Sequence, residues 1–257
     1  MRIVFLTLFA VLASCLSGTG APAAAQAVPA VDPVLQQLDQ VGKNLKEFTA
    51  RVRLTESDTL GKDIVHAGTI YYQKKADGNV RLHVVFDQRI SNGVRSSERK
   101  EYLLDGPVLI DRTYRSKNET KTNVVKPGEK LDLFKLGKGP FPLPIGQDPA
   151  EVHRSFDVKA VAAAKDDPPG HPPHLQLTPK PGTDLARNFH TLDVFVDPKT
   201  NMPLRVDTVD TKQTRFNTTE LQDVVLNPAA GLKDSDFQMP NIDGQPGWTR
   251  TVNELDK

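Results

Sequence analysis

The sequence contains little sulfur and few aromatic residues. Cys15 is the only cysteine among 257 residues, so no disulfide can form within the chain and a hydrophobic core must hold the fold. Aromatic residues make up 6% of the chain, but hydrophobic residues together make up 38%, which suffices for such a core. The formal net charge is only +1, which argues against a strongly basic nucleic-acid-binding protein.

The chain also lacks the motifs of common catalytic sites. It has no G-x-S-x-G, no H-E-x-x-H and no G-x-x-x-x-G-K. Its six histidines are scattered, and "HPPH" at 171–174 has no acidic or cysteine partner at ligand spacing. We therefore expect surface histidines there, and no catalytic residue, metal or cofactor. An envelope hydrolase is the weakest of the functions considered.

Long apolar runs are confined to the N-terminus. Arg2 precedes "IVFLTLFAVLAS", which is short for a membrane span, and small residues follow. This pattern predicts a secretory signal peptide over residues 1–27, with cleavage after Ala27. A second interpretation is "LASC", which ends at Cys15 and matches the lipobox of bacterial lipoproteins, where the cysteine carries lipid. Both interpretations place the protein in the periplasm or cell envelope.

Residues 28–257 are predicted to form a single domain, mainly of antiparallel strands. A helix over 33–48 comes first, with Asp32 as its N-cap. "FTARVRLTES", "VRLHVVFDQ" and both arms of a hairpin at 187–210 alternate apolar and polar residues, as half-buried strands do. "NG" at 92–93 marks another hairpin. Short connections and about eleven strands predict an antiparallel sheet.

A proline-rich insert at 131–147 interrupts this pattern. Proline removes backbone donors and restricts its neighbours, so "GPFPLPIG" cannot be regular structure. A short helix is expected to follow, with Asp148 as N-cap and Pro149 in its first turn. Loops are normally solvated, yet this insert is rich in large apolar residues, which must cover another surface.

A sheet with one apolar face needs a cover, and the helix at 33–48 and the insert are the candidates. Both are small, so we expect an apolar cavity beneath them, the usual form of a small-molecule site. Strand alternation predicts that the cavity is lined by Val52, Leu54, Ile70, Tyr72, Leu82, Val84, Phe86, Leu104, Val194, Leu204 and Val206. The predicted lid residues are Leu38, Phe134, Leu136, Phe141, Leu143 and Ile145.

The order of these segments resembles the periplasmic lipoprotein carriers of the LolA family. The resemblance covers roughly residues 34–240 and rests most on "LTPK", "VFVD" and "GLKDSDFQMP" in the C-terminal third. It implies a strongly curved open antiparallel sheet, a half-barrel, with short helices as a lid over an apolar interior. It also implies a carrier that moves lipoprotein acyl chains from an inner-membrane donor to an outer-membrane acceptor.

One position departs from that family. Its carriers often have W-x-x-R-P after the glycine of the second strand, and the arginine holds the lid closed. Here Tyr71 and Lys74 stand at the tryptophan and arginine positions, and lysine cannot supply a planar fork of donors. Lid control through Lys74 is therefore expected to differ. We expect a monomer that binds lipids or lipoproteins; the alternative is an envelope sensor of the same fold that does not transport lipid.

Overall fold

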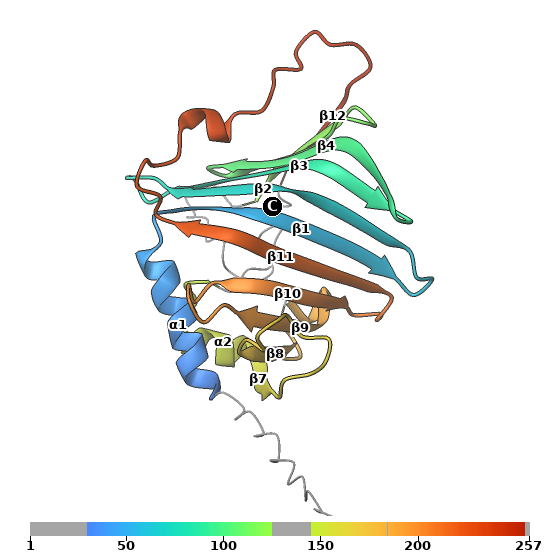
Figure 1. Ribbon diagram of the computed structural model, residues 1–257. Coiled ribbons are helices and arrows are strands. Elements are labelled where there is room, and N and C mark those ends of the chain that lie inside the picture. Colours follow the sequence, from blue (N-terminus) through green and yellow to red (C-terminus); the bar gives the residue numbers. More distant parts are fainter. Residues whose placement is uncertain (1–29, 125–144, 184, 255–257) are drawn as a thin grey trace, which may run out of the picture.

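The computed structural model describes residues 30–124, 145–183 and 185–254, and its main feature is one wide sheet. Twelve strands lie in the order β12-β6-β5-β4-β3-β2-β1-β11-β10-β9-β8-β7 (Figure 1). Neighbours pair antiparallel, except β12 and β6, which are parallel. The prediction of a mainly β, open and mostly antiparallel sheet with short helices is confirmed.

The strands follow one another mostly as hairpins. Their bounds are β1 Glu47–Asp58, β2 Asp63–Lys74, β3 Val80–Ser91, β4 Val94–Asp105, β5 Val108–Thr113, β6 Asn118–Asn123, β7 Phe156–Val161, β8 His174–Pro179, β9 Phe189–Val196, β10 Pro203–Asp210, β11 Arg215–Leu226 and β12 Thr249–Asn253. The predicted "NG" hairpin joins β3 to β4, with Asn92 and Gly93 both at positive φ, as a tight hairpin turn requires. The predicted hairpin at 187–210 is β9 paired with β10.

Two α-helices accompany the sheet in the described part of the chain, α1 (Val31–Asn44) and α2 (Pro149–Ser155). The cap predicted for α1 is wrong: the N-cap is Ala30, and Asp32 lies in the first turn, where its Oδ1 is 2.8 Å from Nε2 of His153 on α2. A negative charge there also interacts favourably with the helix dipole. The cap predicted for α2 is confirmed, because Asp148 Oδ1 accepts a hydrogen bond from the Ala150 amide at 2.8 Å.

The sheet has two chemically different faces. Even-numbered residues of β1 and β2 share one face, which we call the inner face, with partners such as Ala50, Ile70 and Val84 aligned across three strands. This face carries the hydrophobic core. The helices α1 and α2 lie at the β7 end of the sheet (Figure 1), where α1 contributes Val34 and Leu35 to the core. The opposite, outer face is mainly polar.

Gly68 on β2 maintains the register of the inner face. At this point β3 contains one extra residue, Asp87, which pairs with neither β2 nor β4. The backbone of β3 approaches so closely that a Cβ on Gly68 would lie 1.9 Å from the Val85 carbonyl oxygen and 2.7 Å from the Phe86 Cα. Only glycine fits beside this bulge, since no side chain can rotate away from a backbone clash.

The C-terminal segment crosses the outer face after β11. A 3-10 helix, η2 (Asp234–Phe237), sits on β3: Arg81 donates to Asp234 Oδ1 at 2.7 Å and its guanidinium lies 3.9 Å from the centre of the Phe237 ring. His83 Nδ1 lies 2.7 Å from the Asp236 carbonyl oxygen. Further along, the Pro240 carbonyl accepts from Arg112 at 2.6 Å. The segment thus gives hydrogen-bond partners to polar groups buried on this face.

We expect Gly68→Ala to destabilise the protein strongly. The methyl group would force β2 away from β3, and such overpacking costs about 1–3 kcal/mol or more. Urea unfolding followed by circular dichroism measures the loss. Gly61→Ala is the control, because Gly61 has positive φ but open space around it, so only left-handed strain of about 1 kcal/mol is expected. Equal losses in the two variants would contradict the close approach at Gly68.

His83 should make stability depend on pH. Burial lowers the pKa of His83, against the hydrogen bond to Asp236 and the charge of Glu101, which raise it, while Arg99 lowers it further. Its Nε2 is buried without a hydrogen-bond partner, so a second proton there would be unsatisfied. The unfolded chain therefore takes up this proton more readily, and stability is full above about pH 6.5 and falls below it.

His83→Gln should reduce this loss of stability at acid pH, because Gln cannot titrate yet keeps an N–H donor for the Asp236 carbonyl. Denaturant unfolding at about pH 7 and about pH 5 measures the difference between the two proteins. A variant as acid-sensitive as the wild type would show that other groups control the decline.

Candidate functional site

The inner face brings most of the predicted lining residues together in one buried cluster. Nine of the eleven are buried there: Val52, Ile70, Tyr72, Leu82, Val84, Phe86, Leu104, Val194 and Val206. They come from six strands, β1 to β4, β9 and β10. Leu54 is half-buried and packs against the edge of the same cluster. Strand alternation therefore places them on the face expected; that they line a ligand cavity stays a prediction.

Leu204 does not follow the alternation. The register of β9 and β10 shifts between Pro203 and Arg205, so Leu204 falls in an irregularity of the ladder. Pro203 and Val206 are buried on either side of it, while Leu204 is only half-buried and outside the core cluster. A bulge of this kind changes which residues face inward, and a simple period of two cannot reveal it.

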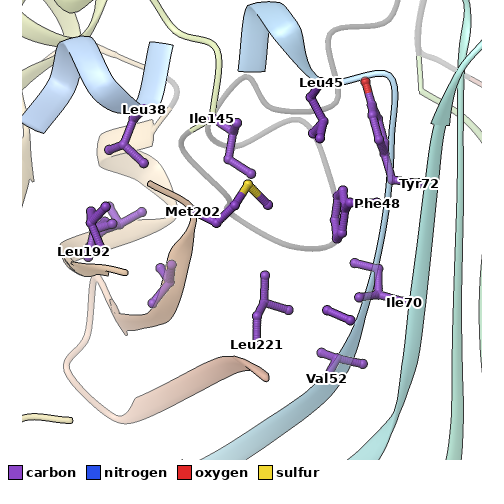
Figure 2. Packing of buried hydrophobic residues seen from close by; sticks show 14 of the residues in the cluster. Leu38, Leu45, Phe48, Val52, Ile70, Tyr72, Ile145, Leu192, Met202 and Leu221 are labelled. Carbon is purple, nitrogen blue, oxygen red and sulfur yellow. The ribbon is translucent and has the colours of Figure 1, made fainter. Parts of the chain in front are cut away.

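The core also contains residues that the sequence did not single out. Met202, in the β9–β10 turn, is completely buried, and Figure 2 shows it turned toward the same interior as Leu38 and Ile145. The turn fixes it there: the Asp197 amide donates to the Met202 carbonyl at 2.8 Å, and the Met202 amide donates to Thr200 Oγ1 at 3.3 Å. A turn position carries no apolar periodicity, so no sequence signal could have identified it.

The described part of the predicted lid is Leu38 and Ile145, both buried in the core. Phe134, Leu136, Phe141 and Leu143 lie outside the described residues. The residues at 145–146 rest directly on α1: the Gly146 amide donates to the Leu38 carbonyl at 3.0 Å. A Cβ on Gly42 would lie 2.3 Å from both the N and Cα of Gly146. The two backbones touch, and this contact, which we call the Gly42–Gly146 seat, holds Ile145 over the inner face.

Lys74 ends β2 with an exposed side chain, and no ion pair of this lysine is found within the described ranges. Its amide donates to the Lys46 carbonyl at 2.7 Å, and its neighbour Lys75 pairs with Asp105 at 2.5 Å. The expected role of Lys74 in lid control therefore stays a prediction. Cys15, the residue of the lipobox interpretation, also lies outside the described residues.

The inner face becomes polar toward the end away from α1. Burial raises the pKa of Asp111 and of Tyr102. Burial by itself would lower the pKa of Lys100, but Tyr102 and Asp111 raise it, and the net direction is upward. The Lys100 Nζ lies 4.8 Å from the centre of the Tyr102 ring. Nearby, His66, whose Nε2 lies 3.6 Å from Glu56 Oε2, lowers the pKa of Glu56. An amphipathic ligand could place its apolar part on the core side of this boundary.

Two further searches of the described residues were negative. They contain no group of three or more His, Cys, Asp or Glu side chains that could hold a metal ion. They also contain no helix long and apolar enough to cross a membrane.

No protein-family model matches the sequence, and no curated protein matches it. Solved structures are similar at low sequence identity. MucB of Pseudomonas aeruginosa, in its complex structure with MucA, is 13% identical with a TM-score of 0.45 over 81% of this chain, which spans 60% of the length of that chain. An uncharacterised conserved protein from Thermus thermophilus is 10% identical, with a TM-score of 0.46 over 87% of this chain and 98% of that one.

A LolA superfamily protein from Nitrosomonas europaea is 12% identical, with a TM-score of 0.34 over 82% of this chain and 99% of its own. The chain is thus similar in structure, at low identity, to LolA-superfamily and MucB-like proteins. These scores are too low to transfer a function to this chain.

Gly42→Ala should loosen the Gly42–Gly146 seat without unfolding the sheet. The methyl group must push residues 145–146 away from α1, while alanine itself favours the helix by roughly 1 kcal/mol over glycine. We expect faster hydrogen exchange of the Gly146 amide and a nearly unchanged unfolding midpoint. Gln40→Ala, at an exposed position of the same helix, is the control. Unchanged exchange at Gly146 in Gly42→Ala would show that the contact is dispensable.

Proposed function

We propose that the inner face binds the acyl chains of a lipid or lipoprotein, and that the protein carries them through the cell envelope toward the outer membrane. The breadth of the apolar face supports this. Its core residues run across β1 to β4 and β8 to β11, whereas α1 and α2 lie at the β7 end (Figure 1). The strong curvature implied by the LolA resemblance would enclose such chains further.

The observation that carries the proposal is how Ile145 is held. Its side chain is fully buried against the inner-face cluster, and the Gly146 amide beside it joins α1 through a backbone hydrogen bond of 3.0 Å and the close glycine contact at Gly42. An apolar side chain that is buried only against other apolar groups can be exchanged for a ligand of similar polarity at modest cost. The Gly42–Gly146 seat therefore fits a cover that opens.

The energetics of acyl chains require such a cover. Each buried methylene contributes about 0.8 kcal/mol, so a long chain in a rigid dry cavity would bind too tightly for release. Returning Ile145 and its neighbours to the inner face when the ligand leaves offsets part of that energy. Nothing in this cycle needs a catalytic residue. Transport in the envelope further requires export, for which the signal pattern at 1–27 is the basis.

Substitution on the inner face should abolish acyl binding, whereas the same substitution one residue further should not. Val84 points into the core, and Val85, the next residue of β3, is half-buried and points to the outer face. We expect Val84→Lys to lose binding of a fluorescent fatty-acid probe by more than tenfold, about 1.4 kcal/mol. Val85→Lys, which faces Glu101 across the strand pair, should bind like the wild type.

Circular dichroism and thermal unfolding must show that both variants fold. If Val84→Lys does not fold, Gly42→Ala replaces it, with altered probe binding or release rates as the expected result. Equal binding by folded Val84→Lys and Val85→Lys would reject the inner face as the site. Probe transfer from donor to acceptor vesicles then separates the two functions: a protein that binds the probe but does not accelerate transfer is a sensor, not a carrier.

A further inference from the structure

A depression lies on the outer face, behind the core and separate from the proposed acyl site. It has a volume of about 340 Å³ and extends over β11, β1, β2, β3 and β4. The β2 residues at its floor, Ala67, Gly68 and Thr69, are small, and the β3 bulge at Asp87 borders it. Small residues and a bulge together leave a hollow where a regular sheet would be covered by long side chains.

Three arginines surround this hollow, Arg51 and Arg53 from β1 and Arg95 from β4. Several arginines elsewhere are committed to protein acceptors: Arg81, Arg112 and Arg205 donate hydrogen bonds of 2.7 Å, 2.9 Å and 2.9 Å. The three in the hollow donate no side-chain hydrogen bond to any described residue. Arg51 and Arg53 only approach Asp223 at 3.9 Å and Glu220 at 3.6 Å, and Arg95 forms no ion pair within the described chain.

We propose that this depression binds a phosphoryl group. Guanidinium groups present planar forks of N–H donors that match phosphate oxygens, and here three arginines that donate no side-chain hydrogen bond to a described residue line one hollow. The amides of Gln88 and Gln222 and the hydroxyl of Thr69 add uncharged donors at its border. Asp87 is the one acidic residue of the lining, so the lining carries a net charge of +2 (three arginines minus one aspartate).

The acidic residues beside the arginines make the site selective for dianions over singly charged anions. Asp223 and Glu220 offset part of the charge of Arg51 and Arg53, and a singly charged anion would gain little by competing with them. A dianion with several oxygens can engage more than one fork at once. Free phosphoryl compounds and phosphomonoester headgroups at a lipid surface present the same oxygens, so both belong to the ligand class of this site.

Isothermal titration of the full mature chain with pyrophosphate, at constant ionic strength, tests the site. We expect binding that weakens at least about tenfold in Arg95→Gln and in Arg53→Gln. Arg95→Lys should also weaken it, because the charge stays but the fork is lost. The matched control is Arg154→Gln on α2, which removes the same charge from an exposed arginine whose ion pair in the described chain is with Glu151. The inner face takes no part, so this test is independent of acyl binding.

Vesicle sedimentation separates the two sources of the phosphoryl group. Binding to phosphatidic-acid vesicles but not to phosphatidylcholine vesicles, lost in Arg95→Gln and kept in Arg154→Gln, assigns the site to a lipid headgroup. Pyrophosphate binding without vesicle binding assigns it to a soluble phosphoryl compound. Binding to neither, an equal loss in Arg154→Gln, or binding only to an acidic polypeptide such as poly-glutamate overturns the proposal.

Discussion

The structure depends on one constraint: a wide sheet with most of its large apolar side chains on one face must keep that face out of water. Hydrophobic burial is worth about 25 cal/mol per Å², and no disulfide is available as a substitute in a chain whose one cysteine is Cys15. Register is therefore critical, because a slip by one residue would turn Ile70 and Val84 to the outer face. Gly68 protects that register by letting β3 bulge at Asp87 without separating the strands.

The same constraint explains why the proposed function depends on the cover. A cover that was tightly fixed would simply complete the core, as in any sheet-and-helix protein. Here α1 lies at one end of the sheet, and Ile145, near the end of the insert, is held beside a glycine-to-glycine backbone contact and the hydrogen bond from the Gly146 amide to Leu38. Stability comes from the apolar face as a whole, so it need not be lost when a ligand takes the place of one covering side chain.

Local patterns were sufficient to predict the parts of the fold that depend on neighbouring residues. Alternation predicted the hairpins and the inward side of Val84 and Val194, and Asp148 marked the start of α2. Features set by distant contacts were not predictable. The strand β12, Thr249–Asn253, is exposed throughout and pairs with β6 far away in sequence, so it has no pattern of its own. Leu204 departs from the alternation because a bulge interrupts its strand. The outer hollow requires arginines from two strands to meet.

The composition of the outer face follows from that of the inner face. Placing the apolar residues inside leaves charged and polar residues outside, where the C-terminal segment satisfies several that would otherwise be buried without partners. Arg112 shows this well: it bonds to Glu119 and to the Pro240 carbonyl, and Trp248 lies 5.9 Å from its guanidinium. Nothing comparable within the described chain reaches Arg95, on the neighbouring strand β4. The segment contacts β3 and β5, pairs with β6 as β12, and leaves the bulge beside Gly68 open, so the bulge that keeps the register also leaves a hollow on the outer face.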